Sequence, residues 1–119
     1  MNGAFQQIIQ HWQDAGNTWI DAKLKSDQLE EDARPYLASL MNDLARAARE
    51  KVSETHLDRE ARGSENYRAY VSRMVLAKAE TLRARVKFDA IDKTFEARRS
   101  HEAMERAKIE KGIFHEGKG

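Results

Sequence analysis

The sequence predicts an all-α protein, and three observations lead to that fold class. Of the 119 residues, 34% are Asp, Glu, Lys or Arg, one is Pro and none is Cys. Such a composition, rich in Ala, Leu, Glu and Arg, is typical of long helices and coiled coils. Apolar residues also recur at intervals of three and four, which is the period of a helix. We therefore expect a bundle of about three helices with a long, coiled-coil-like C-terminal helix, which oligomerisation could complete.

The first helix is expected over residues 4–33. Its inward-facing row steps by threes and fours and consists of Phe5, Ile8, Trp12, Ala15, Trp19, Ala22, Ser26, Leu29 and Ala33. Gly16 is a poor helix former, and the two residues after it, Asn17 and Thr18, are good N-cap residues. Whether the first turns form a separate short helix is left open by this pattern.

The second helix is expected over residues 35–62. Pro35 lacks the amide donor that a helix interior needs but fits the first turn, so we place the start of the helix there. Around Ser53 few apolar residues occur, and the helix is expected to fray or bend. Gly63 is expected to end it in a left-handed conformation, and Ser64 to cap the next helix.

The third helix is expected over residues 65–111, a segment without Gly or Pro, followed by a flexible tail over residues 112–119. It carries a heptad series, namely Tyr67, Tyr70, Met74, Ala77, Thr81, Ala84, Phe88, Ile91 and Phe95. A second row lies about 120° around the helix axis and consists of Val71, Val75, Leu82 and Val86. Two rows imply two neighbours, so this helix is expected to pack against both earlier helices.

Residues 1–111 are expected to form one domain in which the third helix, with about 45 residues, overhangs a partner of about 28. The overhang is either a solvated helix or the contact surface of a second chain. Trp12 and Trp19 are expected to pack in the core, although exposed tryptophans would suit a protein partner. The candidate partner or oligomer contacts are Trp12, Trp19, Met104, Ile109, Ile113 and Phe114.

Charge is unevenly distributed along the chain. Residues 1–66 contain eight basic and twelve acidic residues, whereas residues 67–111 contain twelve basic and seven acidic ones. A basic helix can mark a surface for nucleic acid, or it can complement the acidic half of the same molecule. The candidate phosphate contacts are Arg73, Arg83, Lys87, Arg98 and Arg99.

The sequence contains none of the residue patterns that catalysis requires. It has no phosphate-binding glycine loop, no nucleophile motif and no zinc signature, so we expect no enzyme activity, no cofactor, no bound metal and no small-molecule substrate. His11 with Asp14, and His101 with Glu105, share helix faces, but two ligands do not complete a metal site. The longest apolar run, residues 74–77, is far too short to span a membrane. A cytoplasmic protein is expected.

Two segments carry a resemblance to a known group. They are Trp19-x-x-Ala22-Lys23, followed by Leu29 and Tyr36-Leu37, and the block Arg98–Ala107. In this pattern the chain resembles small α-helical proteins encoded by tailed bacteriophages and prophages, often among replication and recombination genes. The resemblance implies a phage origin, a role in DNA metabolism and a location in the bacterial host cytoplasm.

The expected function is that of a non-enzymatic binding protein, an accessory to DNA replication or recombination. It would act through self-association and through contacts with protein or single-stranded DNA. One alternative is a phage-encoded inhibitor that docks on a host nuclease or defence complex through its acidic N-terminal half, which includes the acidic run Glu30–Asp32, or through exposed tryptophans. A second alternative is a structural spacer or assembly factor.

Overall fold

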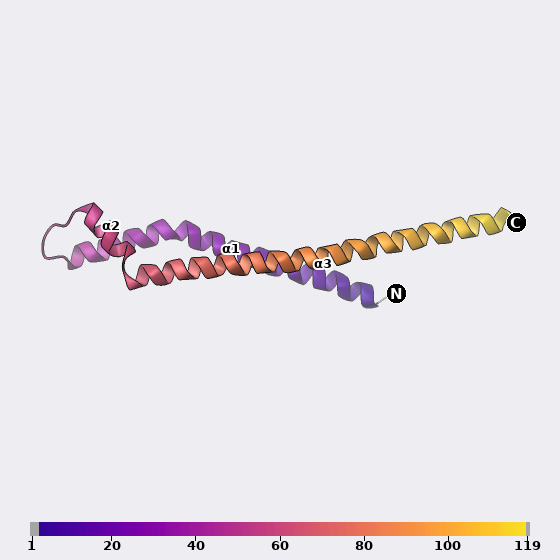
Figure 1. Cartoon of the computed structure of the whole chain (residues 1–119), viewed down its shortest axis with the longest axis horizontal. Coiled ribbons are helices and arrows are strands. Elements are labelled where there is room, and N and C mark those ends of the chain that lie inside the picture. The colour runs from indigo at the N-terminus through magenta and orange to yellow at the C-terminus, as the bar shows by residue number, and fades with distance from the viewer. Residues whose placement is uncertain (1–2, 119) are drawn as a thin grey trace. The chain divides into compact units, whose positions relative to one another are not determined.

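The computed structural model describes the backbone of residues 3–118 and the side chains of residues 3–111. It contains three helices, α1 (Gly3–Ala47), α2 (Glu54–Arg62) and α3 (Glu65–Lys118) (Figure 1). Residues 3–118 contain no strand. The predicted all-α class, with three helices and a long C-terminal one, is therefore confirmed.

The chain divides into two compact units. Unit 1 combines the N-terminal residues up to Thr18 with the segment that begins at Ala84, and unit 2 consists of Trp19–Arg83. Helices α1 and α3 contribute residues to both units.

Helix α1 passes through Pro35, so the predicted boundary between helices over 4–33 and 35–62 is wrong. Proline removes one backbone hydrogen bond and costs about 3 kcal/mol in a helix interior. Packing of the two residues that follow it offsets this cost, because Tyr36 stacks on Tyr70 and Leu37 is buried. Gly16 does not interrupt the helix either, so the first turns are part of α1.

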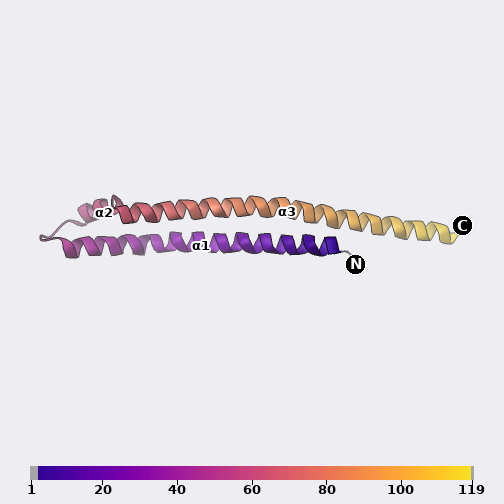
Figure 2. The ribbon, with the colours of Figure 1, turned by 90° about the horizontal axis from the view of Figure 1, so that it is seen from below.

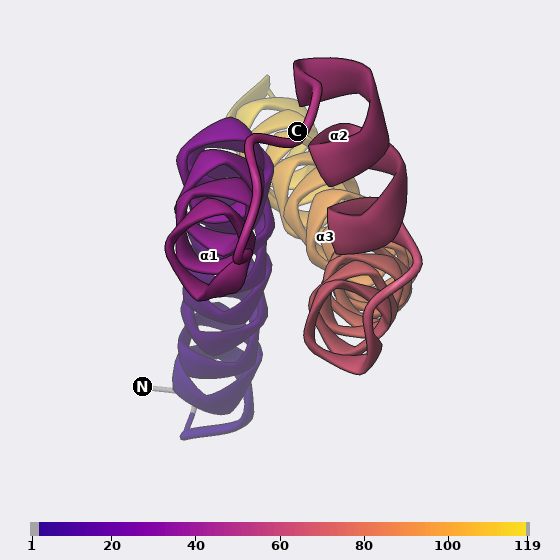
Figure 3. The same ribbon diagram turned by 90° about the vertical axis from the view of Figure 1, so that its left-hand side faces the viewer.

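The chain leaves the helical conformation between Ala47 and Glu54, close to the bend expected around Ser53. The segment predicted as one helix over 35–62 is therefore shared between α1 and α2. Ser53 caps α2, because its hydroxyl oxygen accepts a hydrogen bond from the backbone N–H of His56 at 3.2 Å. Figure 3 shows α2 beside the first turns of α3.

The turn between α2 and α3 lies at the predicted residues, but the conformation of Gly63 differs from the prediction. Its φ of −84° is right-handed, and its backbone N–H still bonds the carbonyl of Arg59. No left-handed residue is needed, because Ser64 begins the next helix at once. The Ser64 hydroxyl accepts from the N–H of Tyr67 at 3.2 Å and donates to the carbonyl of Ala61 at 2.6 Å.

In unit 2, the α1 segment and the α3 segment run in opposite directions (Figure 2). Tyr36 and Tyr70 stack with their ring centroids 4.5 Å apart, and the Tyr70 hydroxyl donates to the carbonyl of Leu29 at 2.6 Å. Two ion pairs join the same segments, Lys78 with Glu30 at 2.7 Å and Lys25 with Glu80 at 4.0 Å. These contacts fix an antiparallel register.

Unit 1 is also an antiparallel pair, held by an aromatic cluster. Trp12 stacks on Phe95 with centroids 4.8 Å apart and lies 6.3 Å from Phe88. Phe5 stacks on Phe95 at 6.2 Å. The indole N–H of Trp12 donates to the carboxylate of Asp92 at 2.9 Å. The packing is therefore aromatic and tied by one hydrogen bond to a charged acceptor.

Both predicted rows that face the opposite helix are confirmed. Every residue of the row on α1, from Phe5 to Ala33, and of the heptad series on α3, from Tyr67 to Phe95, is buried or half-buried. These rows leave only a thin core, since no large side chain among the described residues is fully buried.

The second row on α3 does not pack against another helix as predicted. Val71 is half-buried, but Val75, Leu82 and Val86 are exposed, because among the described residues α1 is the only other long helix. α3 also continues to Lys118 instead of ending in a tail after Lys111. A helix tolerates the single Gly112 and Gly117 at about 1 kcal/mol each.

Candidate binding surface

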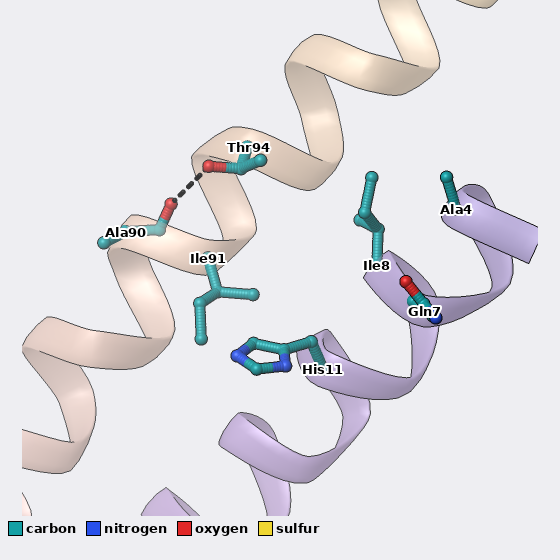
Figure 4. Close-up of a pocket in the computed structure, with 7 residues that line it drawn as sticks. All are labelled: Ala4, Gln7, Ile8, His11, Ala90, Ile91 and Thr94. Atoms are coloured by element: carbon teal, nitrogen blue, oxygen red, sulfur yellow. Dashed lines mark hydrogen bonds between the residues drawn. The ribbon is translucent and has the colours of Figure 1, made fainter.

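A groove of about 560 Å³ lies in unit 1 between the first turns of α1 and the middle of α3 (Figure 4). Figure 4 shows Ile8 and His11 from α1 and Ile91 from α3 lying around the space between the two helices. The seven lining residues are Ala4, Gln7, Ile8, His11, Ala90, Ile91 and Thr94.

Two grooves of unit 1 have a lining without acidic side chains, lysine or arginine, namely this one and a smaller one lined by Gln10, Trp12, Gln13, Asn17 and Phe88. None of the seven residues is Asp, Glu, Lys or Arg, although these types make up 34% of the chain. Gln7, His11 and Thr94 supply polar groups, and the Thr94 hydroxyl donates to the carbonyl of Ala90 at 3.2 Å. The groove therefore offers apolar contact with polar groups beside it, and no ionic attraction.

The small residues of the groove were not singled out by the sequence analysis. Ala4 and Ala90 are exposed and flank the inward-facing rows, so they belong to neither apolar pattern. The signal that could have identified them is the local absence of charge at flanking positions of both helices. That signal becomes meaningful only once the antiparallel register brings residues 4–11 opposite residues 90–94.

The two tryptophans proposed as partner contacts are half-buried within the molecule. Trp12 belongs to the aromatic cluster of unit 1, where Phe88 and Phe95 contact its ring. Trp19 is half-buried in unit 2. Their positions in the inward-facing row agree with the interpretation as packing residues.

The contact residues proposed beyond Phe95 fall into two groups. Met104 and Ile109 are described, and each is 60% exposed. Ile113 and Phe114 have side chains outside the described residues. The charged residues around Met104 and Ile109 pair within the helix, as Arg98 does with Glu102 at 3.3 Å and Lys108 with Glu105 at 3.9 Å.

The five candidate phosphate contacts do not lie in one unit. Arg73 and Arg83 belong to unit 2, whereas Lys87, Arg98 and Arg99 belong to unit 1.

Their local partners also differ. Arg98 pairs with Glu102, and Arg99 pairs with Glu96 at 3.3 Å and lies over the ring of Phe95. The Arg73 guanidinium lies 5.1 Å from the centre of the Tyr70 ring. Among the described residues, Arg83 and Lys87 make no ion pair.

The acidic run proposed as an inhibitor surface is partly engaged in unit 2. Glu30 accepts from Lys78 at 2.7 Å, and Asp32 accepts from the side chain of Gln28 at 3.0 Å. The hydrogen bond to Glu30 and its negative charge raise the pKa of Lys78 above its usual value. The Glu30–Lys78 pair joins an acid of α1 to a base of α3, as the intramolecular interpretation of the charge asymmetry expects, whereas the Lys25–Glu80 pair has the opposite sense.

Tyr70 is the buried titratable group of unit 2. Burial raises the pKa of its phenol, because the anionic form loses hydration, and the negative charge of Asp32 acts in the same direction. The hydroxyl is a hydrogen-bond donor to Leu29. This geometry holds the tyrosine neutral and makes it a packing residue.

The described residues show neither a metal-binding cluster nor a membrane-spanning helix. No three His, Asp or Glu side chains there lie close enough together to hold a metal ion. No helix in that part of the chain has an apolar stretch long enough to span a bilayer.

Comparisons with protein-family models, with curated proteins and with solved structures find no match to this chain. The similarity to phage proteins therefore remains a prediction from the sequence pattern alone.

Proposed function

We propose that this protein is a non-catalytic binding protein that holds an amphipathic helix of a protein partner in the groove of unit 1. The observation that carries the proposal is the uncharged lining of that groove in a highly charged chain. In the expected phage setting, this activity would make the protein an accessory factor of DNA replication or recombination.

The form of the groove supports a helix as its occupant. Its walls come from two helices, residues 4–11 of α1 and residues 90–94 of α3, so an occupant would lie against both. Amphipathic helices bind such channels through apolar side chains spaced by three, four and seven residues. Ile8 and Ile91 supply the apolar floor, and the side chains of Gln7 and Thr94 are available to polar groups at the edge.

The test is site-specific photo-crosslinking in the cells that produce the protein. A benzophenone amino acid replaces Ala90 in the groove or, as the matched control, the exposed Ala69 of α3 outside it. We expect one protein to crosslink from position 90 and not from position 69. The change Ala4→Glu on the opposite wall should abolish that product, because it places a charge in the groove.

Equal crosslinking from both positions would contradict the proposal. So would a product at position 90 that Ala4→Glu leaves unchanged, because the partner would then lie elsewhere. Circular dichroism of the Ala4→Glu variant separates a blocked groove from a lost fold, since Ala4 is exposed and its replacement should leave the helical signal unchanged.

Single-stranded DNA is the second candidate ligand. It is favoured by Arg83 in unit 2 and Lys87 in unit 1, which make no ion pair among the described residues. Binding should weaken steeply as salt rises, because phosphate contacts release counterions. An anisotropy titration with a labelled oligonucleotide at low and moderate salt tests this candidate, and binding that is absent or insensitive to salt would exclude it.

A further inference from the structure

A second, smaller space lies next to the groove of unit 1. It has a volume of about 240 Å³ and is lined by His11, Asp14, Ala15, Thr18, Ala84, Lys87 and Ile91. His11 and Ile91 line the groove as well, and Figure 4 shows them at the end of the groove away from Ala4. The two spaces are therefore adjacent, and we call the second one the adjoining cleft.

The residues that line the groove and the adjoining cleft share one side of unit 1. On α1, residues 7, 11, 14 and 18 are separated by four, three and four positions, and on α3, residues 84, 87, 91 and 94 by three, four and three. Side chains at such intervals lie on one face of a helix. An elongated occupant along this face therefore contacts both spaces, over residues 4–18 of α1. That segment is about 21 Å long at 1.5 Å per residue, the length of a helix of about four turns.

The adjoining cleft differs from the groove because it contains charge. Asp14 and Lys87 line it, one from each helix. The Asp14 carboxylate accepts a hydrogen bond from the side-chain amide of Gln10 at 2.9 Å. Among the described residues, the ammonium group of Lys87 forms no ion pair, with Asp14 or with any other carboxylate. The cleft therefore holds a cation that is available to a negative group of an occupant.

We propose that the partner's helix bears an acidic residue whose carboxylate binds Lys87 in the adjoining cleft. This inference rests on the proposed function, in which that helix occupies the groove, and it specifies the charge that the partner carries. Lys87 lies one turn from Ile91 along α3, which is about 6 Å at 1.5 Å per residue. The partner therefore presents apolar side chains to Ile8 and Ile91, and a Glu or Asp one turn further along the same face.

The cost of removing water from Lys87 favours an acidic partner. A helix lying along both spaces would cover the cleft, and a charge that loses water without a counterion is destabilised. An acidic residue of the partner supplies that counterion, whereas an apolar or basic residue leaves the ammonium group unpaired. Asp14 is the like charge that the partner's carboxylate meets in the cleft, so it weakens the attraction. Lys87 therefore selects between partner helices by charge, and Asp14 limits the affinity that is gained.

The first experiment adds a second substitution to the photo-crosslinking from position 90. Lys87→Glu should lower the yield of the crosslinked product about fivefold or more, because it replaces an attraction by a repulsion. Lys93→Glu is the matched control. Lys93 is an exposed lysine of the same helix and unit that lines neither space, so the same exchange there should leave the yield unchanged.

The sign of the charge effects separates an acidic partner from a basic one. Asp14→Asn should raise the yield, because it removes the like charge beside the partner's carboxylate and keeps an oxygen that accepts from Gln10. A rise with Lys87→Glu together with a fall with Asp14→Asn would mean a basic partner and would overturn the proposal.

Two other outcomes separate this inference from the proposed function. If Lys87→Glu leaves the yield unchanged while Ala4→Glu abolishes the product, the groove stands and the acidic partner is refuted. Absence of any product from position 90 would refute the proposed function, and this inference with it.

Synthetic peptides provide a second measurement with the purified full chain. The probe is a fluorescein-labelled helical peptide of about 18 residues, with leucines spaced by three and four positions. A glutamate stands one turn beyond the leucines at each end, so that either direction of binding brings a carboxylate to Lys87. A second peptide has lysine at both of these positions.

In anisotropy titrations, the wild type should bind the glutamate peptide about fivefold more tightly than the lysine peptide, and Lys87→Glu should reverse that preference. Circular dichroism verifies that Lys87→Glu folds, as expected for a change at an exposed position. Equal affinities of the wild type for the two peptides would contradict the proposal.

Single-stranded DNA is the other anionic ligand available to Lys87, and the same variant distinguishes it. The proposal predicts a reduced crosslinking yield in Lys87→Glu, whether or not the protein binds an oligonucleotide. If Lys87→Glu instead abolishes binding of a labelled oligonucleotide and leaves the product from position 90 at its original yield, Lys87 binds phosphate and not a partner's carboxylate. That result would overturn the proposal.

Discussion

Replacing Trp12 with alanine should destabilise the protein by about 3 kcal/mol. Trp12 takes part in two aromatic pairs, with Phe95 at 4.8 Å and Phe88 at 6.3 Å. Each pair contributes about 0.5–1.5 kcal/mol beyond the burial of apolar surface. The hydrogen bond to Asp92 adds about 1 kcal/mol, below the usual value for a charged acceptor because water reaches this site.

The assay is urea denaturation followed by circular dichroism at 222 nm, which remains usable without the tryptophan. Trp12→Phe keeps a ring in the cluster but removes the indole N–H, so it should lose about 1 kcal/mol. Val86→Ala, in the same unit and 69% exposed, is the control and should change stability by less than about 0.5 kcal/mol. A Trp12→Ala variant as stable as Val86→Ala would refute the aromatic cluster.

Three further predictions concern single residues. Pro35→Ala should stabilise the protein by about 1–3 kcal/mol in the same urea assay, because it restores a helical hydrogen bond inside α1. Gly16→Leu should lose about 1–3 kcal/mol, because a Cβ at position 16 already lies 3.3 Å from the Phe88 ring. Stability should fall as pH rises above about 10, because the unfolded Tyr70 ionises before the folded one, whose pKa is raised. Tyr70→Phe should lose about 1 kcal/mol at neutral pH and make the alkaline fall shallower.

Each of these three predictions has an outcome that would contradict it. Pro35→Ala without any gain would mean that α1 is broken near residue 35. Gly16→Ala serves as the control for Gly16→Leu, since its gain in helix propensity of about 1 kcal/mol opposes the close contact. If Gly16→Leu is tolerated as well as Gly16→Ala, Phe88 does not lie against that position. An unchanged alkaline slope in Tyr70→Phe would show that Tyr70 is not the group responsible.

The helices and their inward faces could be predicted because they depend on local periodicity. Tyr67, Tyr70 and Met74 follow the heptad spacing, and such a row has to be covered wherever the neighbouring helix comes from. The same local information identified Ser64 as a cap, since its hydroxyl acts on backbone groups within three residues.

The continuity of α1 through Pro35 could not be predicted, because it depends on contacts that are distant in sequence. The local cost of the proline is offset by the stacking of Tyr36 on Tyr70 of α3 and by the burial of Leu37. The prediction that α3 packs against two long helices failed for the same reason. With α1 continuous, no third long helix remains to cover Val75 and Leu82.

The candidate binding surface could not be predicted from the sequence pattern, for a different reason. Ala4 and Ala90 are small, exposed and 86 positions apart in the numbering, and they acquire meaning only when the register places them on facing helices. The charged candidates were visible as a composition bias, but a bias does not reveal which cations are paired. Lys78 with Glu30 is such a pair.

The antiparallel pairing of α1 with α3 is the central claim, and nuclear Overhauser effects between aromatic side chains test it most directly. The chain has three tyrosines, two tryptophans and four phenylalanines, so the ring signals are few and assignable. Cross-peaks are predicted between Tyr36 and Tyr70, whose ring centroids are 4.5 Å apart, and between Trp12 and Phe95, at 4.8 Å. Rings that show cross-peaks only to residues three or four positions away on their own helix would contradict the account.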